Sequence, residues 1–148
     1  MFQPTRPGTY TFRYEATDLC KTASETTTVV ARCPPAPEPK AQVSSAVIYQ
    51  DQKVILSSEG TKAGSPTTKI TKYIWRVLEA PAGSPYEKSV KAKTVLSSGI
   101  SYDTGAVAVA GQYKFTLSVS DGCSTATTIV CFEVQCNCGS LACGLLCV

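Results

Sequence analysis

The sequence predicts an all-β protein, an antiparallel sandwich preceded by the terminal hairpin of a second copy. Short runs of alternating apolar and polar residues indicate strands, and Gly, Ser, Pro and Thr turn signals separate these runs. The two ends of the 148-residue chain also carry one segment twice. No segment has a convincing helical period.

The repeat pairs residues 7–33 with residues 110–136 at an offset of 103, without a gap. Eight of the 27 aligned positions are identical, and they include both cysteines of the first copy. Similar segments at a fixed offset are the signature of repeated modules. We therefore predict tandem copies of one module, of which the first contributes only its last part. The identical pairs are Gly8/Gly111, Tyr10/Tyr113, Phe12/Phe115, Asp18/Asp121, Cys20/Cys123, Thr22/Thr125, Ala23/Ala126 and Cys33/Cys136.

Each copy of the repeat predicts a β-hairpin. Apolar side chains at every second position of 113–119 describe a strand with one wet face. The turn "SDGCST" follows, and then a second Thr- and Val-rich run. The inward face of this hairpin is predicted to supply much of the core, namely Tyr113, Phe115, Leu117 and Phe132.

The middle of the chain predicts further strands over 43–49, 53–58 and 71–78, with weaker candidates at 90–97 and 105–110. Trp75 alternates with Tyr73 and Val77, so we assign it to the core, where full burial contributes about 2–3 kcal/mol. The alternative for Trp75 is an exposed platform for a ligand. About seven short strands over about 95 residues are typical of an antiparallel sandwich.

The order of these motifs resembles a known family. "VILSSEG", "ITKYIWRV" followed by "APAGSP", and "AGQYKFTLSVSDG" are together similar to a PKD domain, the immunoglobulin-like sandwich of polycystin-type and other surface proteins. The loop "RVLEAPAGSP" resembles the longer, loop-rich variants of that family. The resemblance implies a hairpin of an incomplete domain over 1–33, a Pro-rich linker over 34–40, a complete domain over 41–135, and a Cys-rich tail or the start of a further module over 136–148.

Eight cysteines and no histidine predict an oxidising, extracellular or cell-surface location. In a sandwich of the kind that the resemblance implies, the last turn and the incoming chain lie at the same end. We therefore hypothesise a disulfide between Cys33 and Cys123, with Cys20 and Cys136 bonded to neighbouring modules. Local or scrambled pairing is the alternative.

The cysteines near the C-terminus are interpreted as disulfide partners as well. A thiolate metal site is the alternative, but paired C-x-x-C knuckles and histidine are lacking. We therefore expect no metal and no cofactor. A small Cys-rich module or cross-linking between subunits fits this tail. The residues concerned are Cys131, Cys136, Cys138, Cys143 and Cys147.

The composition excludes several function classes. Without histidine the chain has no Ser-His-Asp or Cys-His arrangement, so no catalytic residue is expected. No apolar run approaches the roughly 20 residues of a membrane span, and no basic and aromatic interleaving suggests nucleic acid. Lysines in 62–93 make acidic polysaccharide a candidate partner, although a solvated face is the plainer interpretation. Thr-rich patches are candidates for O-linked sugar.

The expected function is that of a non-enzymatic structural segment of a modular extracellular protein. Its repeats would serve spacing, adhesion or filament assembly, with neighbouring domains or identical subunits as partners. The lone hairpin either belongs to a longer array or completes a partial sandwich in another subunit by strand addition. A carbohydrate-binding accessory module of a secreted hydrolase is the alternative function.

Overall fold

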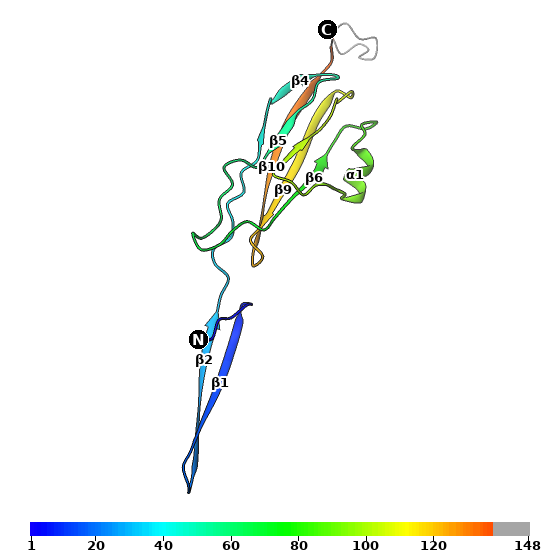
Figure 1. Cartoon of the computed structure of the whole chain (residues 1–148). Helices are drawn as coiled ribbons and strands as arrows, with labels where there is room; N and C mark the ends of the chain where they lie inside the picture. Colours follow the sequence, from blue (N-terminus) through cyan, green and yellow to red (C-terminus); the bar gives the residue numbers. More distant parts are fainter. Residues whose placement is uncertain (138–148) are drawn as a thin grey trace.

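The computed structural model describes residues 1–137 and confirms the all-β class. A two-stranded hairpin, β1 (Gly8–Thr17) and β2 (Thr22–Ala31), extends from one end of a larger two-sheet body (Figure 1). The turn between β9 (Gly111–Ser120) and β10 (Thr125–Gln135) points from the larger body toward this hairpin.

Within residues 1–137, two sheets form the larger body, and all of its strand pairs but one are antiparallel. The exception is β4, which runs parallel to β10 along the outer edge of its sheet. The larger sheet has the order β4 (Val47–Tyr49), β10, β9, β6 (Lys72–Glu79) and β7 (Val95–Ser97). The smaller sheet has the order β3 (Gln42–Val43), β5 (Ile55–Ser57) and β8 (Ser101–Asp103).

The core lies between these sheets and contains the five side chains that were assigned to it. Trp75, Tyr113, Phe115 and Leu117 have no exposed surface, and Phe132 is 3% exposed. The Phe132 ring stacks on Tyr113 and Phe115 at centroid distances of 5.3 and 5.8 Å. The Trp75 indole also donates to the Gly99 carbonyl at 3.2 Å. Because it is wholly buried, Trp75 is a core residue and not a surface platform.

The weaker strand assignments were wrong in part. Residues 87–92 form a helix, α1 (Glu87–Ala92), where a strand over 90–97 was predicted, and only Val95–Ser97 is extended. The Glu87 carboxylate accepts the Gly83 N–H at 2.9 Å, just before the helix. It also pairs with Lys91 at 3.0 Å, one turn further along, and this i,i+4 pair stabilises the short helix. Lys93 ends the helix in the left-handed region at φ 51°. The predicted strand over 105–110 reduces to one bridge, between Gln52 and Val107.

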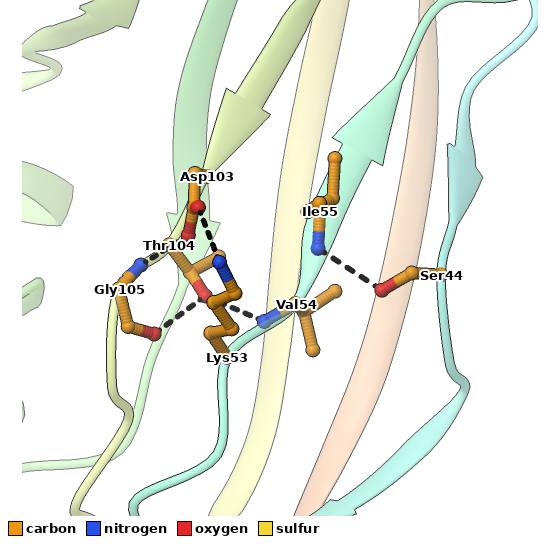
Figure 2. Close-up of polar contacts among 7 residues, drawn as sticks. All are labelled: Ser44, Lys53, Val54, Ile55, Asp103, Thr104 and Gly105. Carbon is orange, nitrogen blue, oxygen red and sulfur yellow. Dashed lines mark hydrogen bonds and ion pairs between the residues drawn. The ribbon is translucent and has the colours of Figure 1, made fainter.

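Side chains satisfy the backbone where the short strands of the smaller sheet stop pairing (Figure 2). The Asp103 carboxylate accepts the Gly105 N–H at 2.9 Å and pairs with Lys53 at 3.3 Å. These two contacts, the Gly105 N–H foremost, lower the pKa of Asp103. The Thr104 hydroxyl accepts a hydrogen bond from the Val54 N–H at 3.0 Å. The Ser44 hydroxyl accepts one from the Ile55 N–H, also at 3.0 Å. These polar side chains therefore serve to satisfy backbone groups at the strand ends, and their arrangement does not call for a bound ligand.

Candidate functional site

The repeat seen in the sequence is also a repeat of strand register. Gly8 pairs with Ala31 in the first hairpin, as Gly111 pairs with Val134 in the second. At the other end Thr17 pairs with Thr22, as Ser120 pairs with Thr125. Every one of these residues is shifted by the same offset of 103. The two hairpins are therefore equivalent elements, residue by residue.

The turn of each hairpin holds a cysteine in the same way. The Asp18 carboxylate accepts the N–H groups of Cys20 and Lys21 at 2.8 and 2.7 Å. The Asp121 carboxylate accepts those of Cys123 and Ser124 at 2.9 and 2.7 Å. These backbone donors lower the pKa of both carboxyl groups. At Asp18 the Cys20 N–H has the largest effect on the pKa, and at Asp121 the Ser124 N–H does. Side-chain to backbone bonds of this kind are how Asp favours turns.

The chain approaches both hairpins along the same path. The Tyr113 hydroxyl donates to the Val109 carbonyl at 2.7 Å, four residues back. The Tyr10 hydroxyl donates to the Arg6 carbonyl, also at 2.7 Å and also four residues back. Both bonds resemble the tyrosine corner of sandwich domains, in which a tyrosine near the start of a strand donates to the backbone a few residues upstream. The first hairpin therefore carries the approach geometry of a complete domain.

A disulfide joins the exit of the first hairpin to the turn of the second. Cys33 is bonded to Cys123 across 90 residues of sequence, with a Cα–Cα distance of 5.7 Å. This is the pair hypothesised from the sequence, and the distance lies within the usual range of about 4.4–6.8 Å. Cys20, at the tip of the first hairpin, is an exposed free thiol, so the local pair Cys20–Cys33 is not formed. We call this bond the staple.

The Pro-rich linker lies along the larger body instead of crossing open solvent. Glu38 and Lys62 exchange backbone hydrogen bonds of 2.9 and 3.1 Å. Gly64 approaches the linker so closely that a Cβ at this position would stand 1.8 Å from the Pro35 carbonyl oxygen. Pro37 is buried. The linker is therefore fastened to the module that it introduces.

The remaining cysteines divide into two groups. Cys131 is an exposed free thiol on the outer side of β10, whereas Cys136 is disulfide-bonded. The sequence-based assignment of Cys136 to a neighbouring module stays a prediction. Three cysteines of the predicted tail, Cys138, Cys143 and Cys147, lie outside the described residues. Within residues 1–137 no cluster of three or more His, Cys, Asp or Glu side chains could hold a metal ion.

Within the lysine-rich stretch 62–93, Lys91 pairs with Glu87 at 3.0 Å, whereas Glu79 pairs with Lys114 of β9, outside the stretch, at 2.7 Å. Arg76 and Lys93 line a shallow hollow of 390 Å³ beside α1, together with Val77, Leu78, Val90 and Thr116. Surface ion pairs of this kind contribute little to stability. Acidic polysaccharide as a partner stays a prediction.

Sequence reasoning missed two residues, one beside the linker and one on the face of the first hairpin. Gly64 lies in the turn-like stretch "KAGSPTT", where nothing distinguishes it from a glycine needed only for a turn. Phe2 lies against the rings of Tyr10 and Phe12 at centroid distances of 5.1 and 4.6 Å. Its position outside the aligned repeat gave no signal.

The site is thus a junction of two equivalent hairpins, one stapled and one with a free cysteine. In the described part of the chain, no helix has the length and apolar character that a membrane crossing needs. No family model matches the chain, and no curated protein matches it either. Hairpin, linker and staple together are therefore the feature of the described residues that bears most directly on function.

Proposed function

We propose that the chain is a non-enzymatic structural segment of an extracellular or cell-surface protein. In this proposal immunoglobulin-like modules of the PKD type follow one another in series, for spacing, adhesion or filament assembly. The two-sheet body over 41–135 and the motif order of the sequence support the module type. The absence of histidine from the sequence supports a role without acid-base catalysis of the His type.

One observation carries the proposal, namely the staple between equivalent places of successive hairpins. Cys33 follows the last strand of one hairpin, and Cys123 lies in the turn of the next. A covalent bond here, in addition to a linker fastened through Glu38 and Lys62, removes freedom of rotation between the two parts. A stiff connection is what spacing and filament assembly require, whereas a flexible linker would serve independent modules.

The redox chemistry of the chain supports the extracellular assignment. The staple lies at an exposed junction and not in a core, so cytosolic reductants would reach it readily. Disulfides persist in secreted and surface proteins and are rare in the reducing cytosol. A stapled junction is therefore a device suited to the outside of the cell.

The proposal is tested by measuring whether the first hairpin tumbles together with the larger body. Backbone ¹⁵N relaxation of the full chain should give one rotational correlation time for residues 8–31 and 41–135. The double variant Cys33→Ser, Cys123→Ser should give a shorter correlation time for the hairpin, because only the linker then connects the two parts.

Cys20→Ser is the matched control, since Cys20 lies in the equivalent turn but has no bond in this chain. It should leave the single correlation time unchanged. A hairpin that tumbles independently in the native, oxidised chain would contradict the proposal, because the junction would then be flexible despite its staple.

A further inference from the structure

The inward faces of the two equivalent hairpins differ sharply in exposure. Leu117 and Phe132 are 0% and 3% exposed in the second hairpin. The residues at the matching positions of the first hairpin, Tyr14 and Val29, are 58% and 44% exposed. An isolated two-stranded hairpin is marginally stable in water. The first hairpin therefore presents an apolar face and two strand edges that its twin has covered.

The second hairpin shows what covers such a face in this protein. β6 pairs antiparallel with β9 and places Trp75 beside Leu117. β4 pairs parallel with β10 and places Ile48 beside Val134. The ring of Tyr86 meets Tyr113 and Phe115 edge-on, at centroid distances of 6.1 and 5.5 Å. Strands at both edges and a ring on the face thus enclose the pair.

Phe2 stands where such a ring would be expected on the first hairpin. It meets Tyr10 and Phe12 edge-on at 5.1 and 4.6 Å, the pair equivalent to the one that Tyr86 contacts. Phe2 is nevertheless 49% exposed, whereas Tyr86 is 6% exposed. One ring from the chain end covers a part of the face that a whole sheet covers in the second hairpin.

We infer that the first hairpin is a docking surface for a partial β-sandwich of the kind formed by residues 33–110, connected to residue 8 as residue 110 is connected to Gly111. A strand equivalent to β6 would lie antiparallel to β1, with a large ring opposite Tyr14 in the place of Trp75. A second strand would lie parallel to β2, with an apolar residue opposite Ala31 in the place of Ile48. A cysteine leading into this partial sandwich would bond Cys20, as Cys33 bonds Cys123.

Two observations favour this occupant over a second copy of the chain. In every copy the space between β6 and β4 is already filled by β9 and β10, so a second copy offers no opening. The bond from Tyr10 to the Arg6 carbonyl also sets the approach of the chain as Tyr113 and Val109 do in the complete body. In the complete body, the segment that contains Val109 comes from β8 of the smaller sheet and leads into β9 of the same module.

The inference rests on the serial arrangement proposed above, but not on the stiffness of the staple. Independent tumbling of the hairpin would remove the proposed role and leave the docking surface intact. Conversely, an intact rigid junction does not depend on what covers the first hairpin.

The test is a fusion in which a second copy of residues 33–110 is placed directly before Gly8 of the chain. By the offset of the repeat, residue 110 then precedes Gly8 as it precedes Gly111. Hydrogen exchange should slow by at least about a hundredfold at the β1 amides that point away from β2, since buried strands exchange only through larger opening events. Peptide mapping without reduction should recover the cysteine of the fused segment joined to Cys20.

Two variants keep the test decisive. Phe12→Asp should abolish the protection in the fusion, yet leave exchange in β9 and β10 unchanged in the unfused chain. A second fusion carries Tyr14→Leu, Ala16→Val, Val29→Phe and Ala31→Val, which gives the first hairpin the buried residues of its twin, and should be protected. Protection in this second fusion without protection of the native hairpin overturns the inference, as does absence of protection in both. Self-association of the unfused chain with protected β1 amides would also overturn it, in favour of a second copy.

Discussion

The two hairpins of this chain have the same local structure and opposite surroundings. Register, turn and tyrosine corner agree between them, while the face that is buried in β9–β10 is largely open in β1–β2. Local chemistry therefore specifies the hairpin, and the rest of the module supplies its burial. Matched substitutions at equivalent positions can separate these two contributions, because only one hairpin contributes to a core.

The largest difference is expected for a core ring. Phe115→Ala should lower the free energy of unfolding of the larger body by about 3–5 kcal/mol, because the residue is fully buried. Phe12→Ala, at the equivalent position, should change it by less than about 0.5 kcal/mol. Denaturant unfolding followed by the fluorescence of Trp75, the single tryptophan, measures both. Equal losses would contradict the contrast drawn between the two faces.

Next in size is the effect of the staple on stability. The double variant Cys33→Ser, Cys123→Ser should lower the free energy of unfolding of the larger body by about 2–4 kcal/mol, since the bond closes a long loop in the unfolded chain. Cys20→Ser should leave it unchanged. The same unfolding experiment, carried out without reductant, measures the three chains. A double variant as stable as the native chain would show that the bond merely joins parts already in place.

Substitution of Gly64 tests how firmly the linker is fastened. Gly64→Ala should destabilise the larger body by about 1–3 kcal/mol, because the added methyl group meets the backbone of Pro35. Gly99→Ala is the matched control, since its Cβ would find its nearest neighbours at 3.4 Å. Thermal unfolding of both variants gives the comparison. A neutral Gly64→Ala would mean that the linker shifts without cost.

The tyrosine corners should differ in their effect despite equal hydrogen-bond lengths. Tyr113→Phe should cost about 1–2 kcal/mol, because it removes a partner from a carbonyl at the margin of the core. Tyr10→Phe should cost a few tenths of a kcal/mol at most, since water can replace the lost hydroxyl at the exposed Arg6 carbonyl. Chemical unfolding of the two variants decides the matter, and the opposite order would argue against it.

The smallest effect concerns pH. The pKa of Asp121 is lowered by the Ser124 and Cys123 N–H groups, so its stabilising contribution is present above about pH 4 and is lost as the pH falls through the lowered pKa. Asp121→Asn should therefore flatten the acid limb of the stability profile of the larger body. Asp18→Asn, with a pKa lowered in the same way, should leave that profile unchanged. Urea unfolding between pH 2 and pH 6 measures both, and identical profiles for all three chains would exclude a contribution from this turn.

Features that extend over many residues of the sequence could be predicted from it. The alternation around Phe115 and Trp75 runs over eight to ten residues in β6 and β9, so the strands and their buried faces were found. The offset repeat located both hairpins. The Cys33–Cys123 pair followed from placing the last turn and the incoming linker at one end of the resembled fold.

Features that depend on contacts distant in sequence could not be predicted. The helix α1 has six residues and none of them is buried, so it has no apolar stripe to reveal it. β8 is three residues long, too short for a period. The approach of Gly64 to Pro35 and the parallel pairing of β4 with β10 exist only once the sheets have assembled. At the junction, the cysteine pair of the staple could be predicted from the sequence, but the contacts that hold the linker against the larger body could not.

The staple also determines how the chain would respond to mechanical tension. A pull applied between the first hairpin and Cys136 travels from Cys33 through the sulfur bridge into Cys123 and along β10. Everything between the two bridged cysteines stays outside the load path, even when the body unfolds. At roughly 3.5 Å per residue, the segment that can extend, from Cys123 to Cys136, is about 45 Å long, whereas the whole stretch from Cys33 to Cys136 would reach about 360 Å. A cable built from such units would unfold under force without growing appreciably longer.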